Sequence, residues 1–139
     1  MILLDTCVVS EPLKPRPEEK VLNWLDDQAA ESLYLSTISL AELLAGVAAL
    51  PAGRRRSALS EELSRVIDRL FAGRILGFDR AAAVQFPGIL TAARKRGFTI
   101  SFADAQIAAI AAAHGLSIAT RDAGPFIAAG LPVIDPWKE

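Results

Sequence analysis

Short apolar runs alternate with longer helical patterns along the whole of this 139-residue chain. Five of the runs are predicted as strands, and in chain order they are ILLD, LYLS, RILGF, LSIAT and PVI. Near-continuous apolar strands are typical of parallel strands that are covered on both faces. Strands that alternate with helices favour an α/β fold with a sheet between helical layers. The sequence therefore predicts a three-layer fold around a mostly parallel sheet of about five strands.

Helical patterns fill the intervals between these runs. One helix is predicted from about Pro17 to Gln28, with its proline in the first turn, and another from near Ser39 to about the LPAG segment. A third helix is predicted over RRRSALSEELSRVIDRLFAG, where apolar residues recur every three or four positions. A fourth, DRAAAVQFPGILTAARKRG, is expected to kink at Pro87. A fifth, SFADAQIAAIAAAHG, is expected to end at Gly115.

The size and composition of the chain fit one domain over residues 1–139. Hydrophobic residues make up 52% of the chain and charged residues 22%, and a domain of this length buries roughly 70% of its unfolded surface. The net charge of −1 neither indicates nor excludes a nucleic-acid partner, because basic residues can gather on one face. Cys7 is the only cysteine, so a reducing compartment is expected. No segment has the roughly 18 uninterrupted apolar residues of a membrane helix, and a cytoplasmic protein is expected.

Four acidic residues stand where strands end or helices begin. Asp5 follows the first predicted strand directly, and Asp122 follows the fourth. Glu42 and Asp104 each lie three residues after a serine at a predicted helix start. Sites in open α/β sheets lie beyond the carboxyl ends of the strands, and a first helical turn sits at the same edge. We therefore expect the four carboxylates to gather at one place.

Two interpretations of Glu42 and Asp104 stay open from these residues alone. Both fit a capping box, in which an N-cap serine (Ser39 or Ser101) bonds the N3 amide and the N3 acid reaches back. In the other interpretation the carboxylates form a metal site, because two charges 4 Å apart repel by about 4 kcal/mol at an effective dielectric of 20 and a divalent cation removes that repulsion. All-oxygen ligands favour Mg²⁺ or Mn²⁺, and the lack of a His or Cys cluster disfavours zinc.

The order of four motifs resembles the PIN domain, in particular the VapC-type toxins and their FitB subgroup: LLDTCVVSE, LSTISLAELLAG, SFADAQIAAIAAAHG and IATRD. The resemblance runs along essentially the whole chain, including PAGRRR and the closing DPW. It implies a Mg²⁺- or Mn²⁺-dependent endoribonuclease whose catalytic and metal-binding quartet is Asp5, Glu42, Asp104 and Asp122. It also implies a homodimer that is held inactive by a cognate VapB-type antitoxin.

The chain departs from this family pattern at two places. Relatives commonly have Asn where this chain has Cys7, so a polar contact near the site is expected to be missing. Relatives often carry another acid just before the Phe that follows TR[DN], whereas Pro125 precedes Phe126 here. Asp122 is therefore the only acidic candidate from this loop.

The implied reaction is hydrolysis of RNA phosphodiester bonds. Asp5 and Asp104 are expected to be direct metal ligands, Glu42 to bind the metal through water or to help deprotonate that water, and Asp122 to complete the shell of a second ion. A bound ion polarises the phosphate and lowers the pKa of a bound water.

Three further residues are candidates for substrate binding. Thr6 and Thr120 are placed to hydrogen-bond ligands or phosphate, and Arg121 to contact phosphate. The basic runs at 54–56 and 94–96 are interpreted chiefly as solvated helix ends.

Two alternatives belong to other functional classes. An aspartate after the first strand also fits a receiver-like phosphoacceptor, but Lys14, Lys20, Lys95 and Lys138 all fall outside the strand end where such a domain needs a lysine. The third possibility is a catalytically degenerate PIN domain that serves only as a binding module, and the presence of all four acids disfavours it.

Overall fold

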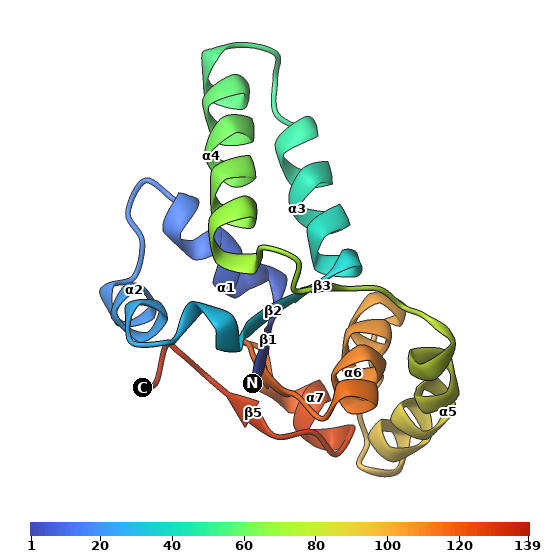
Figure 1. Cartoon of the computed structure of the whole chain (residues 1–139). Coiled ribbons are helices and arrows are strands. Elements are labelled where there is room, and N and C mark those ends of the chain that lie inside the picture. Colours follow the sequence, from blue (N-terminus) through green and yellow to red (C-terminus); the bar gives the residue numbers. More distant parts are fainter.

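The computed structural model describes residues 1–139 and contains five strands in a single sheet (Figure 1). The strands are β1 (Ile2–Leu4), β2 (Leu33–Ser36), β3 (Ile75–Leu76), β4 (Ser117–Ala119) and β5 (Val133–Ile134). Their order across the sheet is β3-β2-β1-β4-β5, and every neighbouring pair is parallel. The predicted α/β fold with five strands is confirmed.

Seven α-helices surround the sheet. They are α1 (Thr6–Ser10), α2 (Glu19–Asp26), α3 (Thr37–Ala48), α4 (Arg54–Phe71), α5 (Arg80–Lys95), α6 (Phe102–His114) and α7 (Ala123–Ala128), with short 3-10 turns η1 (Glu11–Leu13) and η2 (Ala30–Ser32). In Figure 1, α3 and α4 run side by side and project away from the sheet. None of the helices combines the length and apolar character that crossing a bilayer requires.

The sheet separates two hydrophobic clusters, because successive residues of a strand face opposite sides. Leu3 and Ile118 lie side by side on β1 and β4 and pack with residues of α5, α6 and α7. Leu4 and Ala119 are also neighbours and pack on the other side with residues of α1, α2, α3 and α4. Figure 1 shows α5, α6 and α7 grouped on one side of the strands, opposite α1 and α2. This arrangement is the helix–sheet–helix sandwich that the sequence predicts.

Two short helices were not expected from the sequence. In α1 the β-branched residues Val8 and Val9 have weak helix propensity, but both are buried, so packing overrides propensity. In α7 the first turn contains Gly124 and Pro125, which normally punctuate a chain, although proline is tolerated in a first turn. Helix α1 begins two residues after the end of β1 and α7 four residues after the end of β4, and this position gives both helices their importance for the site.

The start of α3 differs from the prediction. Its N-cap is Ser36, whose Oγ accepts a hydrogen bond from the Ser39 amide at 3.0 Å. The predicted capping box of Ser39 and Glu42 is therefore wrong, and Glu42 lies in the second turn of the helix. At α6 the predicted N-cap is correct, because Ser101 Oγ accepts from the Asp104 amide at 3.1 Å.

Helix α5 runs unbroken from Arg80 to Lys95 with Pro87 inside it. The sequence predicts one helical segment that kinks at this proline; the structure assigns a single continuous helix over this segment, and the kink stays a prediction. Ala82, Ile89 and Ala93 are buried along the helix, so packing against the sheet and α6 holds both halves together despite the missing proline N–H.

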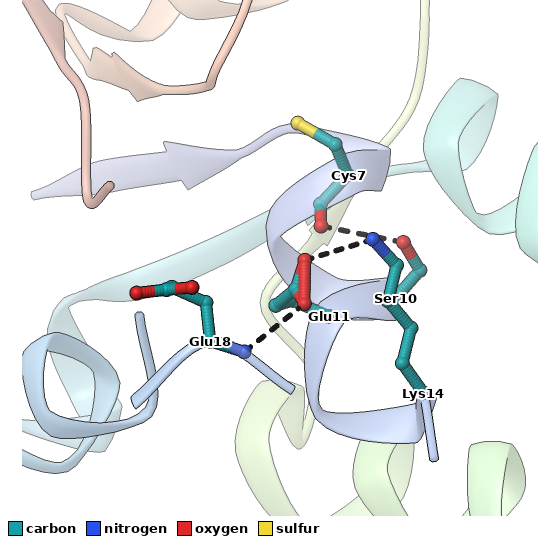
Figure 2. Close-up of polar contacts among 5 residues, drawn as sticks. All are labelled: Cys7, Ser10, Glu11, Lys14 and Glu18. Atoms are coloured by element: carbon teal, nitrogen blue, oxygen red, sulfur yellow. Dashed lines mark hydrogen bonds and ion pairs between the residues drawn. The ribbon is translucent and has the colours of Figure 1, made fainter. Parts of the chain in front are cut away.

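Glu11 is a buried acid that ties the end of α1 to the start of α2. Only 3% of the residue is exposed. Its Oε1 accepts from Lys14 Nζ at 2.9 Å and its Oε2 from the Glu18 amide at 3.3 Å, as Figure 2 shows. The carboxylate thus spans the proline-containing loop between η1 and α2, and it stands apart from the four acids of the predicted site.

Replacing Glu11 with alanine is expected to lower the free energy of unfolding by about 1–3 kcal/mol, because the Lys14 ammonium and the Glu18 amide both lose hydrogen bonds to a charged acceptor. Glu11→Gln keeps an acceptor and is expected to lose less. Urea unfolding of the two variants provides the measurement. Glu18→Ala is the matched control, since its own carboxylate points away from Glu11 in Figure 2 and its amide is retained. Equal stability of Glu11→Ala and Glu18→Ala would contradict this role.

Candidate active site

The strand order reverses at β1, which has β2 on one side and β4 on the other. In open α/β sheets a crevice forms beyond the carboxyl ends of the strands at such a point. An open cavity of about 590 Å³ lies there. Its lining residues are Asp5, Thr6, Cys7, Ser10, Glu42, Asp104, Arg121 and Asp122. All four acids singled out in the sequence therefore border one cavity, and they come from four different elements.

Asp5 is fixed from both sides where β1 passes into α1. Its Oδ1 accepts from the Thr6 amide at 2.8 Å, which makes Asp5 the N-cap of α1. Its Oδ2 accepts from Thr120 Oγ1 at 2.8 Å, and its own amide donates to the Ala119 carbonyl at 2.9 Å. Asp5 is consequently joined to the neighbouring strand β4 by both its backbone and its side chain.

Thr120 is fully buried and does not line the cavity. Its hydroxyl donates to Asp5 and accepts from the Asp122 amide at 3.2 Å. The structure thus places Thr120 behind Asp5, where it orients the carboxylate, and not on the wall that a substrate can touch.

Thr6 links α1 to α3 across the cavity. Its Oγ1 donates to Glu42 Oε1 at 2.9 Å. Because Thr6 also donates its amide to Asp5, a single residue positions two of the four acids. Ser10 lies one helical turn further along α1 and borders the same cavity. Ser10 was not predicted from the sequence, and the i, i+4 spacing from Thr6 identifies it once α1 is known to be a helix.

Asp104 and Asp122 enter the cavity from the starts of two helices. Asp104 is half-buried in the first turn of α6. Asp122 precedes α7, is exposed, and makes no side-chain capping bond. The Asp122 carboxylate is therefore free of partners within the chain.

The pKa values of two of these acids are raised above the ordinary value for an aspartate, by burial and by the nearby negative charges. Burial raises the pKa of Asp5, and the nearby Glu42 and Asp122 carboxylates raise it further, against the hydrogen bonds from Thr120 and Thr6. Burial also raises the pKa of Asp104, and the largest contribution after burial is the charge of Asp5. The folded protein thus holds these carboxylates in a setting that disfavours their ionised forms.

The donor set fits a hard divalent cation. Carboxylate oxygens, hydroxyl oxygens and water are the ligands that Mg²⁺ and Mn²⁺ prefer, and a cation removes the repulsion that raises the two pKa values. No group of three or more His, Cys, Asp or Glu side chains is already drawn together as a metal cage. Mg²⁺ commonly keeps several waters and uses one or two carboxylates, so two of these acids, such as Asp5 and Asp104, would be enough protein ligands for one ion.

Cys7 stands at the site and also contacts the core. Its Sγ lies 3.8 Å from Thr120 Oγ1 and 4.0 Å from Asp5 Oδ2, and the residue packs against the Leu4 cluster. Burial raises the pKa of the thiol, and the charge of Asp5 raises it further. The thiol therefore stays neutral near pH 7 and adds no charge to the cavity.

The basic residues differ in whether they have a partner within the chain or lie at a cavity. Arg96 donates to the Ala128 carbonyl at the end of α7, at 2.6 Å, so it has a structural partner. Arg121 is the only basic residue that lines the cavity. Lys14 and Arg55 border an adjoining hollow of about 330 Å³ that shares Thr6 and Glu42 with the site.

The family model described as "PIN domain" matches residues 2–130 of the chain. The chain belongs to the PIN-domain family. The five-stranded parallel sheet flanked by helices is thus the architecture of this family, and the receiver-like alternative is wrong. No strand of the sheet is followed directly by a lysine, which agrees with that correction.

Within the family the chain stands with the VapC and FitB toxins, which are nuclease-type PIN domains. It is 51% identical over 138 residues to the plasmid stability protein StbB of Pseudomonas syringae pv. tomato, covering 99% of each chain. It is 49% identical to the toxin FitB of Neisseria gonorrhoeae, covering 100% of each chain. It is 47% identical to the VapC ribonuclease Y4jK of Sinorhizobium fredii, covering 99% of each chain.

Solved structures of relatives share the fold closely. The crystal structure of FitAcB from Neisseria gonorrhoeae matches with a TM-score of 0.94 at 49% identity and covers 100% of each chain. A structure of FitAB bound to a DNA fragment also gives a TM-score of 0.94, at 47% identity, and covers 99% of this chain and 96% of that chain. The whole length of the chain is therefore accounted for by one known architecture.

Replacing Asp104 with asparagine is expected to leave the metal-free protein as stable as the wild type or more stable, because it removes a charge that the fold disfavours. The gain in EDTA near pH 7 is expected to be about 0.5 kcal/mol or less, since solvent screens a half-exposed group. Because the folded-state pKa is raised, the penalty in the wild type is absent below the unfolded-state pKa, grows as the pH rises from there, and is complete above the folded-state pKa. The difference between the melting temperatures of the wild type and Asp104→Asn should therefore become smaller as the pH falls towards about 4.

Thermal melts with excess Mn²⁺ complete this test. The wild type is expected to gain more stability from Mn²⁺ than Asp104→Asn does, because a larger Kd reduces the stabilisation RT ln(1 + [L]/Kd). Asp68→Asn, at an exposed position of α4, is the matched control and should behave as the wild type in both conditions. An Asp104→Asn variant that melts lower in EDTA and keeps the full gain from Mn²⁺ would show that Asp104 serves the helix start alone.

Proposed function

We propose that this protein is a Mg²⁺- or Mn²⁺-dependent endoribonuclease, the toxin of a VapBC-type toxin–antitoxin pair that acts in the cytoplasm. The observation that carries the proposal is the convergence of Asp5, Glu42, Asp104 and Asp122 on one cavity at the switch point of the sheet. The name of the relative Y4jK, a VapC ribonuclease with 47% identity, supports RNA as the substrate.

Each acid has a distinct part in the proposed reaction. When bound, the cation supplies Lewis-acid activation of the phosphate and a water of lowered pKa. Asp5 and Asp104 would hold it, since both are partly buried and have raised pKa values that a bound cation would lower. Glu42 is exposed and is aimed by Thr6, which suits it to accept a proton from the attacking water. Asp122 is unpartnered and would be free to complete the shell of a second ion.

The RNA backbone needs positive charge beside these acids. Arg121 supplies it at the rim of the cavity, and its guanidinium suits phosphate oxygens because it offers paired donors in one plane. Arg55 extends the positive charge into the adjoining hollow, whereas the charge of Lys14 is paired with Glu11. Thr6 is placed to contact either a ligand or a phosphate, because it lines the cavity itself.

The proposed partners are a cognate VapB-type antitoxin and a second copy of this chain. Support for the antitoxin comes from the related FitAB and FitAcB structures. Support for the dimer is the apolar surface around α5 and α6, where Val84 is 71% exposed and Phe102 68% exposed. Ile89 and Phe86, on the same helix, pack on the core instead.

The wild-type protein is expected to cleave total RNA with Mn²⁺ or Mg²⁺ and to lose this activity in EDTA. Asp5→Asn is expected to reduce the cleavage rate by about a hundredfold or more, since a ligand is removed while the amide isostere keeps the space filled. The measurement is the initial rate of cleavage on denaturing gels. Asp68→Asn is the matched control and should retain the wild-type rate.

Three outcomes decide between the functional classes. Activity that survives EDTA, or that requires zinc, would overturn the metal mechanism. A wild-type protein that binds Mn²⁺ yet cleaves no RNA would favour the degenerate binding module. Cleavage that depends on Mn²⁺ and on Asp5 supports the proposed nuclease.

The homodimer is tested separately by light scattering coupled to gel filtration at micromolar concentration. The expected mass is twice that of the 14.8 kDa chain. Val84→Glu or Phe102→Glu is expected to shift the mass to that of a monomer, because a charge in an apolar interface is costly to bury. Leu44→Glu is the control at another exposed apolar position, on α3. A wild type that elutes with the monomer mass would count against the dimer.

A further inference from the structure

Arg121 lies among carboxylates and yet forms no ion pair with any of them. The ion pairs of this structure join Lys14 to Glu11 and Lys138 to Asp135. The Arg121 guanidinium instead lies over the ring of Trp137, with its central carbon 5.3 Å from the ring centroid. This distance is within the roughly 6 Å at which a cation is attracted to an aromatic face.

Trp137 has an anchorage that does not depend on Arg121. The residue packs against the core cluster that contains Leu4 and Ala119, the last residues of β1 and β4. Its amide donates to Asp135 Oδ1 at 3.0 Å, which fixes the turn after β5. The closing DPW segment therefore carries an aromatic ring from the far edge of the sheet back to the cavity rim.

The position of Arg121 matters because an arginine and a carboxylate readily form a paired, bidentate contact. If Arg121 closed onto Asp122 or Asp5, the carboxylate would lose affinity for a cation and the guanidinium would lose its free donors. The indole face attracts the guanidinium but uses none of its N–H donors. A stacked arginine thus keeps all of its donors for another oxygen ligand.

We propose that Trp137 is a positioning residue that holds Arg121 apart from the acids, so that the carboxylates stay open to a divalent cation and the guanidinium to an RNA phosphate. This inference rests on the proposed nuclease function and deepens it. It assigns a role in the site to the C-terminal segment, which contributes none of the residues that line the cavity.

The test uses the full chain with Trp137→Leu, Trp137→Phe, Arg121→Gln and the double variant Arg121→Gln/Trp137→Leu. Phenylalanine keeps an aromatic face, whereas leucine removes it. Trp24→Leu is the matched control, because Trp24 packs against the same core cluster and has no cation over its ring. It is expected to lower the melting temperature without altering either readout described below.

The first readout is the Kd for Mn²⁺ from thermal melts, which needs no catalysis. Trp137→Leu is expected to raise this Kd roughly two- to fivefold, the factor that corresponds to an exposed cation–π contact, because the released arginine competes for the carboxylates. Trp137→Phe should stay near the wild type. In the Arg121→Gln background, Trp137→Leu should no longer change the Kd, because no arginine is left to compete.

The second readout is binding of a fluorescein-labelled single-stranded RNA in EDTA at several salt concentrations. Arg121→Gln is expected to reduce the slope of log K against log salt by about 0.7, the value for one lost phosphate contact on a single strand. Trp137→Leu should reduce the slope in the same direction, and Trp137→Phe should restore it. The double variant should match Arg121→Gln alone.

Two results would overturn the positioning role. One is a Trp137→Leu effect on the Mn²⁺ Kd that is equally large with Arg121 and with glutamine at this position, because that pattern describes general loss of structure. The other is a Trp137→Leu variant that matches the wild type in both readouts. Failure of the nuclease proposal is seen separately, as a wild type that does not cleave RNA with Mn²⁺, and the Mn²⁺ readout still judges Trp137 in that case.

Discussion

The hydrogen bond from Thr120 Oγ1 to Asp5 Oδ2 closes the carboxyl ends of the two central strands, at the point where the strand order reverses. The same hydroxyl accepts from the Asp122 amide, and the Thr120 amide donates to the Ile134 carbonyl of β5. One buried threonine thereby sets the position of an acid on β1, the start of α7 and the register with the edge strand. The geometry of the cavity follows from this junction.

The carboxylates of the cavity repel one another in the metal-free protein. Burial and mutual repulsion raise the pKa values of Asp5 and Asp104, so the metal-free fold carries a penalty at neutral pH that the rest of the structure must offset. The two apolar clusters on either side of the sheet supply that stability. A cation that binds only the folded state would turn the destabilising effect of these carboxylates on the fold into a stabilising one. Stability is then coupled to metal binding.

The sequence predicts the layers and the four acids, because both depend on local pattern. Apolar runs identify the strands, and acids at strand ends must meet when parallel strands point the same way. Other features depend on tertiary contacts that pattern does not encode. Helix α1 forms from β-branched residues because Val8 and Val9 are buried, and α3 begins at Ser36 because β2 delivers its last side chain to the Ser39 amide. The local signals at Ser39 and Glu42 matched a capping box and were overridden by the end of the strand.

The carboxylates and the Arg121 guanidinium lie close together in this cavity without forming ion pairs. Each of the groups named below is instead in contact with a neutral side chain. Thr120 holds Asp5, Thr6 holds Glu42, and the ring of Trp137 lies under the Arg121 guanidinium. A salt bridge would satisfy each group more fully in isolation, but it would leave no affinity for an external cation or anion. By contrast, Glu11 and Lys14 do pair directly, beyond the border of the cavity, and their contact connects two segments of the chain. The choice between neutral and charged partners thus separates the groups that stabilise the fold from those that stay available for a ligand.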